Sequence, residues 1–426
     1  MKISRGKLPL SLMAVVISAV ALIGMIFTED LRALTGTSLL MLKASSKKAA
    51  VAANSTKLSS EEREKKAAVD VEEDKVELVN GGECSVSEGR WVFNSSREIP
   101  YSDRSCPYLD KQVACLRNGR PDDNYLYWEW ELDDCTLPKF NPGAVLEKLR
   151  GKRLMFVGDS LQREQWQSFV CLVQSHIPQQ HKSMNKSRPH SVFKLKEYNA
   201  TIEFYWAPFL VQSNTDGRII SDTRKRIIRV DSITKHAQHW LGVDILVFNT
   251  YMWWMSGQRI KSLWGSFDNG EEGYEELDVV VAYRISLKTW ANWIDSTINP
   301  NSTRVFFSTV SPAHIRSSDW HRKKGIKCYN ESMPVMERGY WGSGSDRRMM
   351  EVVRSVVGRM KVPVTFLNIT QLSEYRIDGH TSVYTEFQGK VLSDEQKANP
   401  KQYADCIHWC LPGVPDTWNR LFYAYL

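Results

Sequence analysis

The sequence lacks any concentrated tract of basic residues interleaved with aromatic ones, although it carries a net charge of +7 over 426 residues. Its Lys and Arg residues are spread along the chain, which disfavours a nucleic-acid-binding protein, because such proteins gather their basic residues in a patch or stripe. A modestly basic surface suits an acidic polysaccharide or the phosphates of a small molecule equally well. The chain also contains no internal repeat, which excludes a repeat architecture.

Charged residues are absent from Leu8 to Phe27, a stretch of 20 residues that is long enough to span about 30 Å of hydrocarbon. Basic residues precede it and acidic residues follow it, so the positive-inside rule predicts a cytosolic tail (1–7), a signal-anchor (8–27) and a lumenal remainder. The alternative is a cleaved signal peptide, whose apolar core is normally about 7–15 residues. No clear A-x-A cleavage site follows, and we therefore predict a single-pass type II membrane protein.

Aromatic residues are absent from residues 43–77, which are dominated by Ala, Ser, Lys and Glu. Such a segment buries too little apolar surface to fold by itself, so residues 28–82 are predicted to form a lumenal stem. Seven N-x-S/T sequons support the secretory pathway and are predicted glycosylation sites: Asn54, Asn94, Asn185, Asn199, Asn301, Asn330 and Asn368.

Typical metal-ligand spacing is missing. The eight cysteines, all beyond the apolar stretch, are Cys84, Cys106, Cys115, Cys135, Cys171, Cys328, Cys406 and Cys410. An even number of cysteines in an oxidising compartment favours four disulfides. The alternation of Cys406, His408 and Cys410 leaves zinc as an alternative, but zinc sites usually show C-x2-C or H-x3-H spacing and use reduced thiols. We predict that no metal is bound.

The part of the chain that is predicted to fold has two regions of different composition and pattern. Residues 83–142 are rich in cysteine and aromatic residues and predict a compact, disulfide-stapled subdomain with little regular structure. Residues 143–426 alternate between buried strands and helices, which predicts an α/β domain with a parallel sheet and helices on both faces. The predicted strands are 152–157, 243–249, 303–311 and 362–370, and the predicted helices are 161–173, 283–298 and 346–360.

Ser160 is the candidate nucleophile. A buried strand ends at Val157, Gly158 permits a tight turn, and Ser160 stands where a helix begins. This places the hydroxyl at the carboxyl end of a parallel strand, where open α/β sheets hold ligands. The alternative is that Ser160 only caps the helix.

A nucleophilic serine needs a base, and the base needs an orienting carboxylate. "DCIHWC" (405–410) supplies both, since a spacing of three puts Asp405 and His408 on the same side of a helical turn. Cys406 and Cys410 are then expected to anchor this turn to the rest of the domain. His314 follows a strand and is a candidate to line the cleft, whereas His321 and His380 stand in polar, loop-like contexts, and none of the three has a comparable carboxylate.

These motifs resemble those of the plant trichome birefringence-like family. "VGDSLQREQW" contains the GDSL tetrapeptide, and "DCIHWCLPGVPDTWNRLF" is similar to the family's C-terminal DxxH block. The cysteine-rich stretch, "YWAPFLV" and "LVFNTYMWWM" look like its remaining blocks, so the resemblance covers residues 82–426. Many relatives carry Gly-His where this chain has Tyr251-Met252, and the "NTYxWW" form resembles the xylan-acetylating branch.

The resemblance implies an SGNH-hydrolase-like, three-layer α/β/α fold and polysaccharide O-acetyltransferase activity in the Golgi, with xylan as the favoured acceptor. It assigns Ser160 as nucleophile, His408 as base and Asp405 as its orienter. The resemblance also implies four disulfide pairs: Cys84–Cys135, Cys106–Cys171, Cys115–Cys410 and Cys328–Cys406.

The expected reaction moves an acetyl group through an acetyl-serine onto O2 or O3 of xylosyl residues. Ser160 N–H, the Asn249 side chain and Arg163 are the expected oxyanion donors. Trp253 and Trp254 are candidates to stack the sugar chain, with core packing as the alternative. An acetyl donor is required, for which acetyl-CoA is a candidate, although no CoA-phosphate motif is visible.

Three other functions remain open at this point. The same triad serves an acetylesterase that uses water as the acceptor, and another wall polysaccharide is an alternative substrate of an acetyltransferase. A non-enzymatic, carbohydrate-binding scaffold is the third, against which the complete Ser/Asp/His set argues.

Overall fold

The structure, a computed structural model, describes residues 76–77, 83–84 and 88–426 except 219, 221 and 256. The predicted cytosolic tail, the signal-anchor, Asn54 and nearly all of the stem therefore lie outside the described residues. In the described part of the chain, every helix is too short or too polar to cross a membrane.

The centre of the molecule is a seven-stranded sheet in the order β14-β13-β10-β5-β8-β7-β6. Its first five strands in this order are parallel, and they include all four strands that the sequence predicts. Their bounds are β14 (Val364–Leu367), β13 (Arg304–Ser308), β10 (Ile245–Phe248), β5 (Arg153–Gly158) and β8 (Ala200–Trp206).

The prediction of a purely parallel sheet was wrong, because the sheet is mixed. β6 (Lys182–Asn185), β7 (His190–Leu195) and β8 form an antiparallel meander at one edge. Only four residues separate each strand of this meander from the next, and a parallel crossover needs a dozen or more. The short loops therefore reverse the chain direction at β7.

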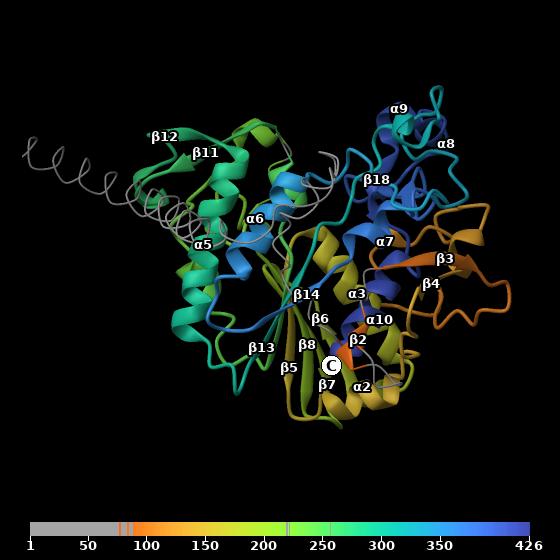
Figure 1. Ribbon diagram of the computed structural model, residues 1–426, viewed down its shortest axis with the longest axis horizontal. Coiled ribbons are helices and arrows are strands. Elements are labelled where there is room, and N and C mark those ends of the chain that lie inside the picture. The colour runs from red at the N-terminus through yellow and green to blue at the C-terminus, as the bar shows by residue number, and fades with distance from the viewer. Residues whose placement is uncertain (1–75, 78–82, 85–87, 219, 221, 256) are drawn as a thin grey trace, which may run out of the picture. The chain divides into compact units, whose positions relative to one another are not determined.

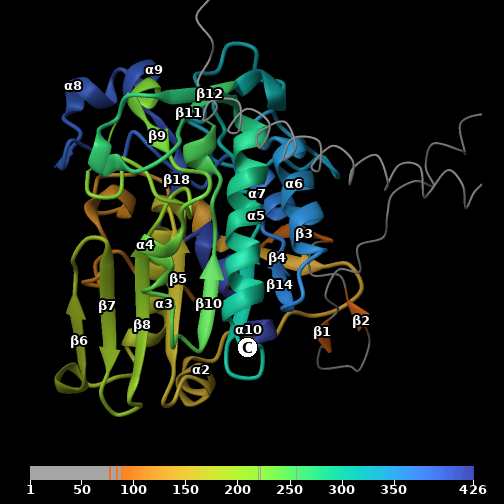
Figure 2. The ribbon, with the colours of Figure 1, turned by 90° about the vertical axis from the view of Figure 1, so that its left-hand side faces the viewer.

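Helices cover both faces of the sheet (Figures 1 and 2). The aromatic contacts show why, because successive side chains of a strand point to opposite faces. Phe306 packs on Phe422 of α10 (Val414–Tyr425), whereas its neighbour Phe307 packs on Trp290 of α5 (Val279–Thr297). The three predicted helices are α3 (Ser160–Gln174), α5 and α6 (Arg347–Val357). α3 packs beside α10, and α6 packs beside α5. The three-layer arrangement follows from these two apolar faces.

Short elements connect and border the sheet. The remaining strands are β1 (Val76–Glu77), β2 (Glu83–Cys84), β9 (Ile227–Ile228), β11 (Arg259–Leu263), β12 (Tyr274–Asp278), β15 (His380–Ser382), β16 (Glu386–Phe387), β17 (Lys390–Val391) and β18 (Asp405–Trp409). The remaining α-helices are α2 (Pro142–Lys148), α4 (Thr234–Ala237), α7 (Thr370–Glu374), α8 (Asp394–Lys397) and α9 (Pro400–Tyr403). The 3-10 helices are η2 (Lys111–Val113), η3 (Asn124–Tyr127), η4 (Gln179–His181), η5 (Thr223–Lys225), η6 (Met252–Trp254), η7 (Phe267–Asn269) and η8 (Ser317–Trp320).

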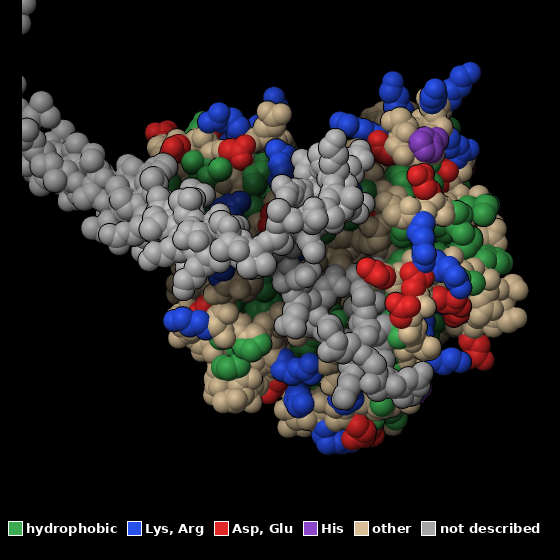
Figure 3. All heavy atoms as spheres, viewed as in Figure 1, with side chains coloured by type: hydrophobic (Ala, Val, Ile, Leu, Met, Phe, Trp, Pro, Cys, Tyr) green, Lys and Arg blue, Asp and Glu red, His purple; other side chains and the backbone are tan. Residues whose placement is uncertain are grey.

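The cysteine-rich segment packs into the same hydrophobic core as the sheet. Its strands β3 (Gly89–Phe93) and β4 (Trp128–Leu132) pair antiparallel. The Trp91 indole donates to the Leu372 carbonyl at 2.7 Å, and the Arg376 guanidinium lies over its ring. Figure 3 shows acidic and basic side chains side by side over β3 and β4, where Arg90 pairs with Glu131 and Arg338 with Asp133. The cysteine-rich segment therefore packs directly against the α/β domain.

Candidate active site

Ser160 stands at the sharp turn between β5 and α3. The carboxylate of Asp159 accepts the Leu161 N–H at 2.9 Å, so Asp159 is the helix cap and Ser160 begins the helix. A Cβ on Gly158 would lie 2.3 Å from the Asn249 carbonyl oxygen, so only glycine allows the end of β5 to approach the neighbouring strand this closely. The turn presents the serine hydroxyl at the carboxyl edge of the sheet.

His408 and Asp405 meet Ser160 in a hydrogen-bonded chain. His408 Nε2 lies 2.7 Å from Ser160 Oγ, and His408 Nδ1 lies 2.7 Å from Asp405 Oδ2. These are the contacts that a nucleophile, a general base and an orienting carboxylate require. The structure thus brings together three residues that stand up to 248 positions apart in the chain.

Asp405 and His408 lie on a strand, not on the helical turn that their spacing predicts. β18 pairs with β15, but its register shifts between the pairs Ser382–Asp405 and His380–Trp409. Asp405 Oδ1 accepts the backbone N–H groups of Ile407 and His408 at 3.0 and 3.1 Å. The extra residues of this bulge fold back over the carboxylate, which brings both side chains to one face of the strand.

The electrostatics of the pair favour an imidazolium beside a carboxylate. Burial would lower the pKa of His408, but the charges of Asp405 and Glu164 and the hydrogen bond to Asp405 raise it to about 9. Burial would raise the pKa of Asp405, but the charge and hydrogen bonds of His408 hold it well below its ordinary value. Asp405 therefore stays ionised and stabilises the protonated histidine that forms during proton transfer.

Glu164 is a second buried carboxylate next to the histidine. It lies on α3 one helical turn after Ser160, and its Oε2 accepts the Trp409 N–H at 3.0 Å. The side chain is fully buried, and its Oε1 has no hydrogen-bond partner among the described residues. Burial raises the pKa of Glu164 to about 8. Sequence reasoning missed this residue, although the helical spacing from Ser160 was a usable signal.

Disulfides hold the strand that carries the histidine. Cys328–Cys406 and Cys115–Cys410 anchor β18 on either side of His408, and Cys106–Cys171 ties the cysteine-rich segment to α3. These three pairs match the predicted ones. Cys84–Cys135 stays a prediction, because the side chain of Cys84 lies outside the described part of the structure.

The predicted oxyanion donors differ in their surroundings. The Asn249 amide nitrogen donates to the carbonyls of Ser308 and Thr309, each at 3.1 Å. Asn249 thus links the ends of two strands and is absent from the lining of the pocket, and its role as an oxyanion donor stays a prediction. Arg163 does line the pocket beside Ser160 and donates to Gln112 Oε1 at 2.7 Å. Gln112 Nε2 lies 3.1 Å from His408 Nδ1, a contact that sequence reasoning missed.

The two tryptophans predicted to stack sugar have different positions. Trp254 is fully buried, packs on Phe209 and Tyr283, and donates to Thr250, so it is a core residue. Trp253 lines the pocket, but the Arg226 guanidinium lies 4.0 Å from its ring centroid. One face of the Trp253 ring is therefore covered by a cation in this structure.

The other histidines that the sequence singled out do not line the pocket. His314 and His380 are buried, with Nδ1 of His314 lying 2.6 Å from Nε2 of His380. His380 Nδ1 in turn lies 3.1 Å from the His408 carbonyl and supports the strand from behind. His380 was predicted in a loop and lies on β15 instead, whereas His321 is exposed.

The pocket around Ser160 and His408 has a volume of about 850 Å³ and opens at the carboxyl edge of the sheet. Loops after four parallel strands line it, as expected for an open α/β sheet. Within the described residues, no group of three or more His, Cys, Asp or Glu side chains could hold a metal ion.

The chain matches two family models. Residues 137–425 match the GDSL/SGNH-like acyl-esterase family found in Pmr5 and Cas1p, and residues 82–136 match the PMR5 N-terminal domain. The chain belongs to the GDSL/SGNH-like acyl-esterase family.

Similar members of the GDSL/SGNH-like acyl-esterase family are plant proteins. The chain is 55% identical to "Probable xylan O-acetyltransferase 8" of Oryza sativa subsp. japonica, over 100% of this chain and 99% of that protein. It is 63% identical to "Protein trichome birefringence-like 3" of Arabidopsis thaliana, over 81% of this chain and 79% of that protein. It is also 50% identical to "Xylan O-acetyltransferase 6" of Oryza sativa subsp. japonica, over 80% of this chain and 62% of that protein.

Proposed function

We propose that this member of the GDSL/SGNH-like acyl-esterase family acetylates xylan on O2 or O3 of its xylosyl residues. The observation that carries the proposal is the Ser160–His408–Asp405 chain of hydrogen bonds at the edge of an open pocket. Relatives named xylan O-acetyltransferases support xylan as the acceptor.

The proposed reaction has two steps through an acetyl-serine. Ser160 Oγ attacks the acetyl carbonyl while its proton passes to His408 Nε2, which lies 2.7 Å away. The bond between the acetyl carbon and its carrier breaks, and the imidazolium returns the proton to the leaving group. A xylosyl hydroxyl then attacks the acetyl-serine, gives its proton to His408, and Ser160 regains that proton as the ester bond breaks.

The oxyanion of both steps forms beside the first turn of α3. The Ser160 N–H has no intrahelical partner at this position, and the N-terminus of the helix favours negative charge. We assign the Ser160 N–H and the Arg163 guanidinium as its donors, since Asn249 is engaged with two carbonyls. Acetyl-CoA is the donor that we propose.

We also propose that the protein is a Golgi type II membrane protein with its pocket in the lumen. The uncharged stretch at residues 8–27, the cysteines and the sequons support this location. Four sequon asparagines are exposed and suit glycosylation: Asn185, Asn199, Asn301 and Asn330. Asn94 and Asn368 are half-buried, and Asn368 is followed by the fully buried Thr370, which makes these two sequons less accessible.

The test incubates the purified full chain with acetyl-CoA and xylo-oligomers and analyses the products by mass spectrometry and NMR. We expect acetylated oligomers with wild type and none with Ser160→Ala. Release of free acetate without acetylated oligomer would instead identify an acetylesterase. Acetylation of a different wall polysaccharide in preference to xylan would correct the acceptor alone.

A further inference from the structure

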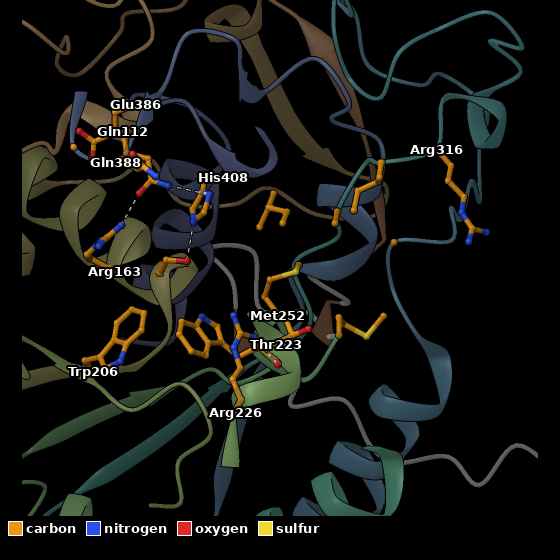
Figure 4. A pocket seen from close by; sticks show the side chains of 18 of the residues that line it. Gln112, Arg163, Trp206, Thr223, Arg226, Met252, Arg316, Glu386, Gln388 and His408 are labelled. Atoms are coloured by element: carbon orange, nitrogen blue, oxygen red, sulfur yellow. Dashed lines mark hydrogen bonds between the residues drawn. The ribbon is translucent and has the colours of Figure 1, made fainter. Parts of the chain in front are cut away.

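The pocket beside the triad is strongly basic. Four arginines line it, which we call the arginine cluster: Arg163, Arg188, Arg226 and Arg316. Among the described residues of the lining, Glu386 is the only acidic one. In the view of Figure 4, Arg163 and Arg316 lie on opposite sides of the pocket and Arg226 lies below them. The four cations therefore belong to the lining of the pocket that a ligand of Ser160 would enter.

Three members of the arginine cluster have no ion-pair partner among the described residues. Arg188, Arg226 and Arg316 form no ion pair with any described residue, and Arg163 makes one long contact of 3.5 Å with Asp110. Burial and the nearby charge of Arg163 lower the pKa of Arg188, and burial lowers the pKa of Arg226. Arg224 of the adjoining η5, by contrast, pairs with Asp222 at 3.0 Å. Like charges gathered without counter-ions are expected to attract an anionic ligand.

Two of these guanidiniums are held in place by aromatic rings. Arg188 lies 5.0 Å from the ring centroid of Trp206, and Arg226 lies 4.0 Å from that of Trp253. The two indoles are buried and contact each other edge to face, with centroids 5.4 Å apart. Arg226 is further fixed by hydrogen bonds to the carbonyls of Ile220 and Trp253. Guanidiniums that are ordered before binding lose little entropy when they bind an anion.

We propose that the arginine cluster binds the phosphate groups of the acetyl donor and so determines that the donor is a phosphorylated thioester. This inference rests on the proposed acetyl transfer at Ser160. The transferred acetyl group and a xylosyl backbone are both neutral, so neither gives four arginines a counter-charge. Two guanidiniums on touching indoles match the adjacent negative groups of a diphosphate, whereas a single carboxylate is satisfied by one bidentate arginine.

The test compares two thioester donors in the purified full chain: acetyl-CoA, and S-acetylpantetheine, which has the same reactive end without phosphates. Arg188→Gln, Arg226→Gln and Arg316→Gln are each measured for kcat/KM of thiol release. We expect a loss of about tenfold with acetyl-CoA for each variant, because a charge-assisted contact is removed, and little change with S-acetylpantetheine. Added salt should weaken acetyl-CoA use in wild type more than in the variants. Arg224→Gln is the matched control, since Arg224 is exposed and does not line the pocket.

Two results would overturn the proposal. Equal losses with both donors would mean that the arginines shape the pocket without binding phosphate. Unchanged kinetics with both donors, combined with a loss only for xylo-oligomers that carry a uronic acid, would assign the cluster to an acidic acceptor.

The failure of the proposed function has a different signature. Thiol release and acetyl-serine formation, the latter seen by intact mass, need no acceptor. If they depend on the arginine cluster while no xylo-oligomer is ever acetylated, the phosphate site stands and the xylan assignment fails. Quenching of tryptophan fluorescence by CoA alone gives a binding readout that is independent of any turnover, and Arg188→Gln/Arg226→Gln should weaken it.

Discussion

At the scale of single residues, the position of Ser160 depends on the residues immediately before it. Gly158 lets β5 approach the Asn249 carbonyl, and Asp159 takes the capping role that Ser160 could otherwise have filled. The serine hydroxyl is consequently left for His408. This local geometry makes a defined prediction for the triad.

Ser160→Ala and His408→Ala are each expected to lower acetyl transfer by more than about a thousandfold, and Asp405→Asn to lower it strongly. The reason is that nucleophile and base act as one unit, so the losses should not add in the double variant. The measurement is kcat/KM for acetylation of xylo-oligomers. A double variant much slower than either single variant would contradict the shared role, and circular dichroism checks that each variant is folded.

Glu164 should contribute, after Asp405, to the pH dependence of the first step. His408 acts as a base only when it is neutral, and its pKa is raised to about 9 in part by the charges of Asp405 and Glu164. The rate of acetyl-serine formation should therefore rise with pH towards that value. Glu164→Gln removes one of the charges that favour the imidazolium, so the rising limb of the kcat/KM profile should move to lower pH.

The groups around Glu164 that bear on this prediction are His408 and Asp405 on β18 and Arg163 on its own helix. Glu351→Gln, at an exposed position of α6, is the matched control and should leave the profile in place. Glu164→Ala differs again, because it leaves the Trp409 N–H without an acceptor and should lower stability by about 1–3 kcal/mol. If the rising limb of the kcat/KM profile stays in place in Glu164→Gln, Glu164 does not influence the pKa of His408.

At the scale of elements, β18 is a short strand that is fixed at both ends. Its hydrogen bonds to β15 are interrupted by the bulge that brings Asp405 to His408. Cys328–Cys406 and Cys115–Cys410 supply the rigidity that the interrupted ladder lacks. Closing loops of 78 and 295 residues is worth roughly 4–6 kcal/mol each in the chain-entropy model.

Cys410→Ser should impair catalysis even where the protein still folds. A general base about an ångström out of place can cost on the order of a hundredfold in rate, so kcat should fall by up to that factor. Reductant should inactivate wild type in the same way, which the acetylation assay measures alongside thermal unfolding.

Chelators distinguish this disulfide role from a metal role. They are expected to leave activity unchanged, because Cys406 and Cys410 are both in disulfides. Inactivation by a zinc chelator with recovery on adding zinc would contradict the assignment, as would free thiols at both positions in non-reducing peptide mapping.

At the scale of the whole molecule, the proposed orientation predicts where the protein can be reached. In sealed microsomes, protease added from outside should leave the C-terminal domain intact, and glycosidase should shift its mass after the membrane is opened. Digestion of the domain in sealed vesicles would show that the predicted topology is wrong. Asn185→Gln and Asn301→Gln should each remove one glycan, since both residues are exposed.

The sequence by itself determined the features that are local or strongly periodic. Four of the five parallel strands, three of the four longest helices and the turn at Ser160 all follow from short apolar patterns and their boundary residues. The parallel part of the sheet also explains why Ser160 lies at a ligand-binding edge. The spacing of Asp405 and His408 identified the correct pair of residues although it predicted the wrong local structure.

Only the tertiary structure decided what depends on contacts between distant segments. Asn249 has the residue type of an oxyanion donor, yet its amide nitrogen donates to the carbonyls of Ser308 and Thr309 at the end of the neighbouring strand. Trp253 and Trp254 are adjacent in sequence, yet one lines the pocket under Arg226 and the other is in the core. The arginine cluster is invisible in the sequence, since its members come from α3 and from separate loops that meet only in the folded structure. A side chain's type is local, but its free hydrogen-bonding capacity and its net charge environment are set by whichever partners the fold places beside it.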